Sequence, residues 1–142
     1  MFPWLTIITL TPLVGAVLLL FIPKGKDNFI KNFSIVWSLI PFALGTALWL
    51  VFFDPDSPKM QFEELAQWIP SIGVGYHVGV DGLSIPLVWL TGLLTTLGLF
   101  YSARVITERV REFFFMFLLL ETGMLCVFVS LDFFLFYVFW EL

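Results

Sequence analysis

Two glutamates lie inside strongly apolar stretches, and their side chains are the best placed in the sequence to do chemistry. Glu121 follows the apolar run 113–120, and Glu141 follows the aromatic run 133–140. If these stretches span a membrane, both carboxyls lie where an acidic side chain costs about 2.5–3.5 kcal/mol. Acidic residues at such positions serve mainly in pairing or in ion paths. The candidate chemistry is therefore proton transfer.

The spacing of the two glutamates predicts that they lie at similar depth. Leu131, at the centre of a tight turn over residues 130–132, is ten residues from each of them. At about 1.5 Å per residue, Glu141 lies about 13–14 Å beyond Asp132, near the middle of a hydrocarbon core about 30 Å thick. Low dielectric favours the protonated form of a carboxyl, and repulsion between two close carboxylates favours it further. We therefore expect at least one of them to hold or pass a proton near neutral pH.

Each glutamate also has a structural interpretation. Glu121 could equally be a protonated acid that hydrogen-bonds across helices. For Glu141 the functional interpretation is favoured, because an ionisable group at mid-membrane is a functional candidate by default. A lysine near either carboxyl would favour its charged form, but no lysine occupies the interior of an apolar stretch. The chain therefore supplies the carboxyl groups, but not the lysine, of a lysine–carboxyl pair that could take up and release a proton.

Other polar residues have simpler interpretations. Asp132 is expected to cap a helix rather than to take up protons, and His77 to be solvated or bonded within its turn. Cys126 is expected to be a small packing residue. The arginines of the segment 103–112 are expected to fix topology, with binding of a lipid headgroup or partner as the alternative.

Composition predicts an all-α integral membrane protein. Of 142 residues, 60% are hydrophobic and 13% are charged, and the mean hydropathy is +1.00. A soluble domain needs a far more polar surface. A single cysteine excludes a disulfide or a CxxC metal site within the chain. Without a nucleotide loop, flavin motif or cysteine cluster, redox chemistry is not expected in this chain.

We predict one membrane domain over residues 1–142, built as a bundle of about five transmembrane helices. The predicted spans are residues 3–22, 30–53, 83–102, 113–129 and a truncated 132–142. The first span is expected to be retained, since it lacks the basic start and the Ala-x-Ala site of a signal peptide. Pro41 is expected to kink the second span.

The long connection over residues 54–82 is predicted to lie on the outer side. Within it, residues 62–69 are expected to form a short amphipathic helix at the interface. Apolar and polar or glycine residues alternate over 72–81, which predicts a strand or half of a small β-hairpin. Asp81 or Ser84 is expected to cap the third span.

Loop charges orient the predicted spans. The first loop carries Lys24, Lys26 and Lys31, and the third carries three arginines, whereas the loop over 54–82 is acidic. The positive-inside rule places the first and third loops on the cytoplasmic side and the N-terminus outside. Small and hydroxyl residues at helical spacing predict the faces along which the spans pack. These residues are Ser34, Ser38, Pro41 and Gly45; Thr91, Thr95, Gly98 and Ser102; and Thr122, Cys126 and Ser130.

Three short motifs resemble a known family. They are Gly-Val-Asp-Gly-Leu-Ser at 79–84, Leu-Leu-Glu-Thr-Gly-Met at 119–124 and Phe-Tyr-Val-Phe-Trp-Glu at 136–141. Together they resemble the N-terminal part of subunit M of proton-pumping NADH:quinone oxidoreductase, the NuoM/NdhD family or chain 4 of complex I. The resemblance covers the whole chain but about the first third of a typical member. This family is similar to subunits of multisubunit cation/proton antiporters.

The resemblance implies roles that composition alone does not. Glu141 matches the fifth-helix glutamate used in proton translocation together with a lysine on a later helix, whereas nothing in the resemblance covers Glu121. It implies an outer N-terminus and a hairpin over the outer surface. It also implies membership of an NAD(P)H or ferredoxin:quinone oxidoreductase, whose quinone, flavin and iron–sulfur clusters lie in partner subunits, with no cofactor in this chain.

The expected surroundings follow from the same resemblance. The partners are other membrane subunits, including antiporter-like ones, with lipid and protons but no nucleic acid. The membrane is the bacterial cytoplasmic membrane, with the thylakoid membrane as the alternative. Because the later helices of the family are absent here, the isolated chain is not expected to be catalytic. Two other functions stay open: a cation/proton antiporter subunit and a truncated, non-catalytic membrane scaffold.

Overall fold

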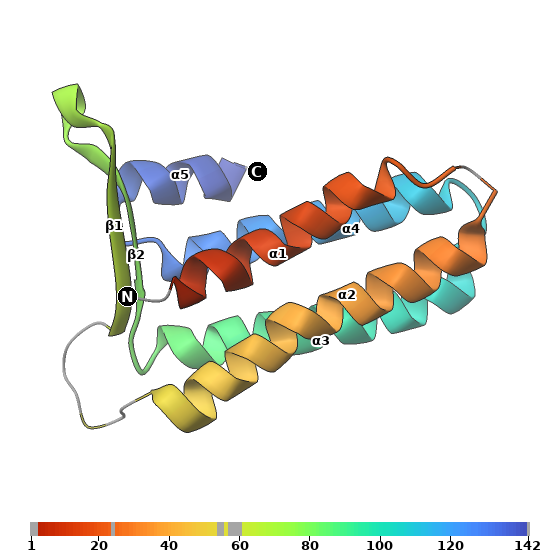
Figure 1. Ribbon diagram of the computed structural model, residues 1–142, viewed down its shortest axis with the longest axis horizontal. Coiled ribbons are helices and arrows are strands. Elements are labelled where there is room, and N and C mark those ends of the chain that lie inside the picture. Colours follow the sequence, from red (N-terminus) through yellow and green to blue (C-terminus); the bar gives the residue numbers. More distant parts are fainter. Residues whose placement is uncertain (1–2, 24, 54–55, 57–60, 142) are drawn as a thin grey trace.

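Four long helices lie side by side and antiparallel in the computed structural model, which describes residues 3–23, 25–53, 56 and 61–141 (Figure 1). They are α1 (Trp4–Leu19), α2 (Asp27–Ala47), α3 (Ser84–Val105) and α4 (Val110–Val129). A π-helical turn, Leu48–Phe52, prolongs α2. A fifth helix, α5 (Phe133–Glu141), starts beside the end of α4 and runs back along it.

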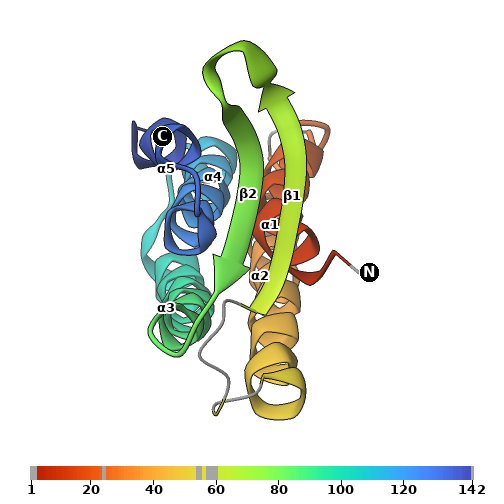
Figure 2. The ribbon, with the colours of Figure 1, turned by 90° about the vertical axis from the view of Figure 1, so that its left-hand side faces the viewer.

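The four long helices form a ring in which each packs against its neighbours in sequence and α1 closes against α4. Viewed from the end, α1 and α2 make one side of the bundle and α3 and α4 the other (Figure 2). Helix α5 stands outside this ring and contacts α4 and the strand β2 (Val74–Val80). The predicted helix bundle with a short β-hairpin is thus confirmed.

Three helices have the length and composition to cross a membrane: Asp27–Phe52, Ser84–Val105 and Val110–Val129, with 26, 22 and 20 residues. Helix α1 is also apolar but has 16 residues, and α5 has 9. Each of the five predicted spans therefore coincides with a helix. That all five cross the bilayer stays a prediction.

Helix ends extend further into the polar loop between α3 and α4 than predicted. Helix α3 continues to Val105, and α4 begins at Val110, immediately after Arg109. Arg109 adopts a left-handed backbone with φ of 50°, and the N–H of Phe113 bonds to its carbonyl at 3.0 Å. The polar residues Arg111 and Glu112 thus belong to the first turn of α4, because a helix end outside the hydrocarbon core can carry charged side chains.

A two-stranded antiparallel hairpin lies across one end of the bundle (Figure 2). Strand β1 (Gln61–Ile69) pairs with β2 so that Glu64 faces Val78 and Ala66 faces Tyr76. The predicted strand over 72–81 is confirmed as β2. The predicted helix over 62–69 is wrong, because this segment satisfies its backbone N–H and C=O groups by pairing with β2 instead.

The core has two parts, which we name by their positions in the bundle. The hairpin-side cluster consists of Leu5, Ile8, Leu48, Val78, Val80, Ile85, Val88, Leu125, Val129 and Leu135. The loop-side cluster consists of Ala16, Leu19, Ile30, Leu99, Val110, Phe114 and Leu118. Because Val78 and Val80 of β2 belong to the first cluster, the hairpin is part of the core rather than a mobile flap.

The predicted packing faces are largely confirmed. All four predicted residues of the second span, Ser34, Ser38, Pro41 and Gly45, are buried on α2. On the next two helices, Thr91, Thr95, Thr122 and Cys126 are buried as well. Small residues let the helices approach closely: a Cβ at Gly92 of α3 would lie 3.1 Å from Cα of Phe42 on α2. The α2–α3 interface is therefore of the small-residue kind found in membranes.

Candidate functional site

Glu141 is the last described residue of α5, eight residues beyond Phe133 where the helix starts. Its side chain is exposed on the outside of the four-helix ring. Three large side chains of the same helix, Phe133, Tyr137 and Trp140, are also exposed. A carboxyl on such a surface is open to whatever packs against α5, whether lipid or another protein segment.

Asp132 fixes the start of α5. One carboxylate oxygen, Oδ1, accepts the N–H groups of Phe134 at 2.9 Å and Leu135 at 3.2 Å. This is the geometry of a helix N-cap, so the predicted capping role is confirmed. The other oxygen, Oδ2, accepts the N–H of Gly75 on β2 at 3.1 Å. These backbone donors, that of Gly75 foremost, hold the pKa of Asp132 below its usual range.

The turn before α5 is itself joined to the hairpin. The N–H of Leu131 donates to the carbonyl of His77 at 2.8 Å, and Ser130 forms an isolated bridge with Val78. The side chain of His77 lies 3.5 Å from the Glu63 carboxylate, so it is bonded within the hairpin as predicted. The hairpin therefore holds the turn from which α5 starts.

Glu121, unlike the exposed Glu141, is fully buried. Its exposed fraction is 0%, and it lies on the face of α4 that carries Leu118 and Leu125, two residues of the core clusters. Neither of its carboxyl oxygens has a hydrogen-bond partner among the described residues. The cross-helix hydrogen bond expected as its structural interpretation is therefore not found in this part of the chain.

The two glutamates are not brought together. Between α4 and α5 lies an apolar groove of about 260 Å³, lined by Leu120, Gly123, Met124, Val127, Phe128, Phe139 and Trp140. Glu121 points into the bundle rather than into this groove, and Glu141 is exposed beyond it. Each lies eight residues from the helix end nearest the turn, which agrees with the expected similar depth. Direct repulsion between the two carboxyls is not supported.

A third glutamate, Glu64 on β1, was missed from the sequence. Its Oε2 accepts the N–H groups of Leu5 at 3.0 Å and Thr6 at 3.1 Å. It thereby caps α1 across 58 residues of sequence, which Pro3, the residue before that helix, does not do. The one signal in the sequence was that α1 starts without a capping side chain of its own. This signal does not show which distant residue caps the helix.

Tyr76 completes the contact between the hairpin and α1. Its hydroxyl lies 2.9 Å from the hydroxyl of Thr6, and burial, the largest effect, raises its pKa. Just before α3, Asp81 accepts the N–H groups of Leu83 at 3.0 Å and Ser84 at 2.9 Å. The Ser84 backbone bond is the main reason that the pKa of Asp81 is lowered. The predicted cap at Asp81 is confirmed.

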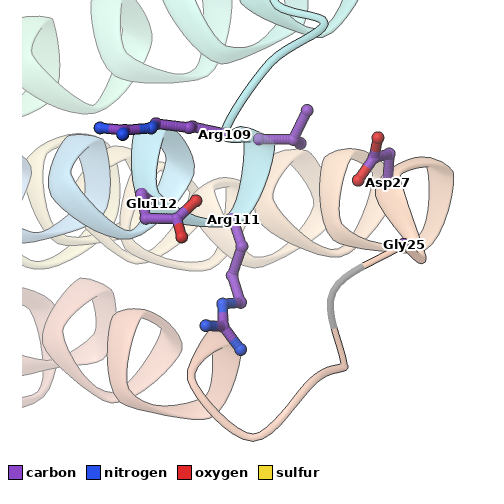
Figure 3. Close-up of a pocket in the computed structure, with 6 residues that line it drawn as sticks. Gly25, Asp27, Arg109, Arg111 and Glu112 are labelled. Atoms are coloured by element: carbon purple, nitrogen blue, oxygen red, sulfur yellow. The ribbon is translucent and has the colours of Figure 1, made fainter.

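At the other end of the bundle, the arginine-bearing loop borders a cleft of about 350 Å³ (Figure 3). Its lining comprises Gly25, Asp27, Arg109, Val110, Arg111 and Glu112. Figure 3 shows Arg111 reaching from α4 toward the connection between α1 and α2, where its Nη1 donates to the carbonyl of Ile22 at 3.2 Å. Equal numbers of arginines and carboxylates line this cleft, so it does not select an anion.

Comparisons with known proteins agree with the motifs. The chain is 42% identical to NAD(P)H-quinone oxidoreductase chain 4 1 of Thermosynechococcus vestitus, over 99% of this chain and 27% of the relative. It is 38% identical to chain 4 3 of Picosynechococcus sp., over 99% of this chain and 26% of the relative. It is 37% identical to chain 4 of Prochlorococcus marinus over the same shares. No protein-family profile matches.

A solved structure matches the fold. Respiratory complex I from Thermus thermophilus with bound NADH contains a chain that matches with a TM-score of 0.75 and 29% identity. The match covers 96% of this chain and 26% of that one. The chain thus spans about a quarter of the length of the relatives that it matches. Its similarity to chain 4 along its own length confirms the resemblance inferred from the motifs.

Proposed function

We propose that the chain is the N-terminal part of an antiporter-like membrane subunit of a quinone-reducing, redox-driven proton pump. Similarity to chain 4 over 99% of the chain is the observation that carries this proposal. In it, Glu141 contributes a mid-membrane carboxylate to the proton path. Because the chain spans about a quarter of those relatives, the activity, substrates and partners of the whole protein all belong to the proposal.

The geometry of α5 suits Glu141 to this role. Asp132 and the hairpin fix where the helix starts, so the depth of the carboxyl is set by a rigid helix rather than by a loop. The carboxyl is exposed on the outside of the bundle, where a lysine from another helix can approach it. An approaching ammonium favours the carboxylate and releases the proton, and its withdrawal favours proton uptake.

The charges at the two ends of the bundle support a topology in which the hairpin and the N-terminus lie on the outer side of the membrane. Carboxylates at the hairpin end cap α1, α3 and α5, whereas all three arginines lie at the opposite end, where the α1–α2 and α3–α4 connections meet (Figure 1). By the positive-inside rule the arginine end is cytoplasmic. For the membrane we propose the bacterial cytoplasmic membrane, with the thylakoid membrane as the alternative.

Electron transfer belongs to partner subunits in this proposal. Quinone, flavin and iron–sulfur clusters are held there, together with the site for the electron donor, NAD(P)H or ferredoxin. This chain contributes to the membrane part, beside other antiporter-like subunits and lipid. Its exposed apolar surface on α5 is available for such neighbours.

Co-purification tests the assignment. An affinity tag on the full-length protein, expressed in its own host, is expected to retain iron–sulfur and flavin absorbance and quinone reductase activity in mild detergent. The control is the same purification from the untagged strain. A preparation without redox centres whose proteoliposomes exchange Na⁺ for protons would contradict the proposal and favour the antiporter. A preparation with neither activity would favour the scaffold.

A further inference from the structure

Seven polar residues of the described chain are buried in the bundle, and all lie in one layer. They are Thr9, Ser34, Ser38, Thr91, Thr95, Glu121 and Thr122. On each of the four helices they fall between residues of the hairpin-side cluster and residues of the loop-side cluster. We call this region the polar layer. It is enclosed along the bundle axis by apolar side chains on both sides.

Most hydroxyls of the layer are satisfied by their own helix. Thr9 and Thr91 each donate to the carbonyl four residues earlier at 2.8 Å, and Ser38 donates to Ile35 at 2.7 Å. Ser34 and Thr95 make no such bond, and their hydroxyls have no partner within the described chain. The same holds for both oxygens of Glu121. Unsatisfied polar atoms therefore occur on three different helices.

Thr95 lies beside Phe117 and Met124, which flank Glu121 on α4, whereas Ser34 lies roughly 7 Å nearer the loop end, because Ser38 pairs with Thr96 across the α2–α3 contact. Ser34 follows Ile30 by four residues, Thr95 precedes Leu99 by four, and Glu121 follows Leu118 by three. The residues Ile30, Leu99 and Leu118 all belong to the loop-side cluster. Each polar side chain thus stands one helical turn from the same group of packed residues. Since α4 packs against both α2 and α3, the three buried groups all lie in the interior of the ring.

Helix α1 adds an acceptor to this space. Pro12 is buried inside α1 and precedes Ala16 of the loop-side cluster by four residues, so it lies at the same level. Proline has no N–H, so the carbonyl of Ile8 receives no α-helical bond from position 12. The Ile8 carbonyl thus lacks the donor that would continue the α-helical bonding of α1 at this level.

Burying these groups without hydrogen-bond partners would destabilise the folded protein. Each unsatisfied buried hydroxyl or carbonyl costs about 1–3 kcal/mol, and an isolated carboxylate costs far more. Buried water normally satisfies such groups, with two to four hydrogen bonds per molecule. A neutral acid can donate one bond and accept others, which suits a site that offers hydroxyls and carbonyls.

No charged side chain reaches the polar layer from the elements around α4. Helix α1 has no titratable side chain, and among the described residues the only other titratable group within the bundle near this level is the Cys126 thiol. The others lie toward the ends of the bundle or on α5: Asp27 and Lys31, Tyr101 and Arg104, Arg111 and Glu112, Tyr76 and His77, and Tyr137 and Glu141. Nothing among the described residues balances a negative charge on Glu121.

We propose that the polar layer is a hydrated proton-binding site. Glu121 carries the proton, and ordered water joins its carboxyl to the hydroxyl of Thr95, to the carbonyl of Ile8 and, further toward the loop end, to the hydroxyl of Ser34. The two apolar clusters separate this site from both ends of the bundle. It lies inside the α1–α4 ring, apart from Glu141, and it does not depend on the function proposed above.

Infrared spectroscopy of the full-length protein in its complex tests this directly. We expect a protonated-carboxyl C=O band that disappears in Glu121→Gln and persists in the control Glu108→Gln, an exposed loop position. Thr95→Val, which removes one hydroxyl of the site, is expected to shift the band to higher frequency. Thr91→Val should leave it in place, because the Thr91 hydroxyl bonds its own helix.

Three results would overturn the proposal. Absence of a Glu121-dependent band would mean that the carboxyl is ionised. A band that Thr95→Val does not shift would mean a dry acid without a water network. A wild-type band that vanishes on adding Na⁺ would mean a cation site. Should the variants fail to assemble, water density between Glu121, Ser34 and Thr95 in the wild-type complex is the independent readout, and its absence, where other buried waters are visible, would contradict the proposal.

Discussion

The carboxylates of this protein differ in what surrounds them. Glu64, Asp81 and Asp132 lie at the hairpin end, where each accepts two backbone N–H groups at the start of a helix. These are structural roles, since a helix N-terminus carries unpaired donors and a partial positive charge. Glu121 and Glu141 accept no such backbone donor among the described residues, and they are the two carboxyl groups that we consider for proton chemistry.

Glu64→Ala is expected to lower the free energy of unfolding of the membrane domain by about 1–2 kcal/mol, the usual cost of a lost helix cap. The variant leaves the first N–H groups of α1 without their acceptor. The midpoint of thermal unfolding in detergent measures the effect. The matched control is Glu63→Ala on the same strand, whose carboxylate contacts His77 at 3.5 Å. An equal effect of both variants would show that the cap does not stabilise α1.

The carboxylate of Asp132 is expected to make the stability of the fold depend on pH. Its pKa is lowered in the folded protein, so its stabilising effect is complete above the unfolded pKa of about 3.9. It is lost as the pH falls through the lower folded value. We therefore expect Asp132→Asn to be less stable than the wild type near neutral pH and the gap to close in acid. Unfolding midpoints across this range measure it, and a gap that stays constant or widens in acid would refute the assignment.

At the scale of elements, the hairpin connects the helices. It caps α1 through Glu64, contributes Val78 and Val80 to the core, and binds the start of α5 through Gly75 and His77. Alternation along 72–81 was enough to predict β2. The amphipathic pattern of 62–69 fits a helix or a strand, and only the neighbouring β2 edge decides between them. Glu64 could not be assigned for the same reason, because its partners lie 58 and 59 residues away.

The contact between α2 and α3 gives a second test at this scale. Gly92→Ala would place a Cβ 3.1 Å from the Cα of Phe42, and backbone cannot yield as a side-chain tip can. We expect a loss of about 1–3 kcal/mol, the cost of overpacking. Gly45→Ala is the control, since its Cβ would lie 3.9 Å from Val88, an ordinary contact. Equal unfolding midpoints for the two variants would mean that this interface is loose.

For the whole molecule, the sequence predicted the class, the five apolar helices and most of the faces that pack. Each followed from local patterns: apolar runs, loop charges and small residues at helical spacing. The burial of Glu121 away from Glu141 could not be predicted in this way. Equal depth follows from counting residues, whereas the face of α4 on which Glu121 lies depends on how four helices close into a ring.

Orientation is testable by labelling. In the full-length protein, Glu63→Cys on the hairpin is expected to react with a membrane-impermeant maleimide from the outer side only. Glu108→Cys in the α3–α4 loop is expected to react from the cytoplasmic side only. The native Cys126 is buried and serves as the unreactive background. Labelling of both positions from one side, or in the reverse order, would contradict the predicted topology.

Proton pumping by the assembled complex tests the role of Glu141 most directly. The measurement is the number of protons moved per electron pair in membrane vesicles carrying Glu141→Gln, with Glu108→Gln as the control. We expect the ratio to fall in Glu141→Gln while the complex still assembles, because the amide cannot take up and release a proton. The control is expected to keep the wild-type ratio. A wild-type ratio in a fully assembled Glu141→Gln complex would contradict a role for this carboxyl in proton translocation.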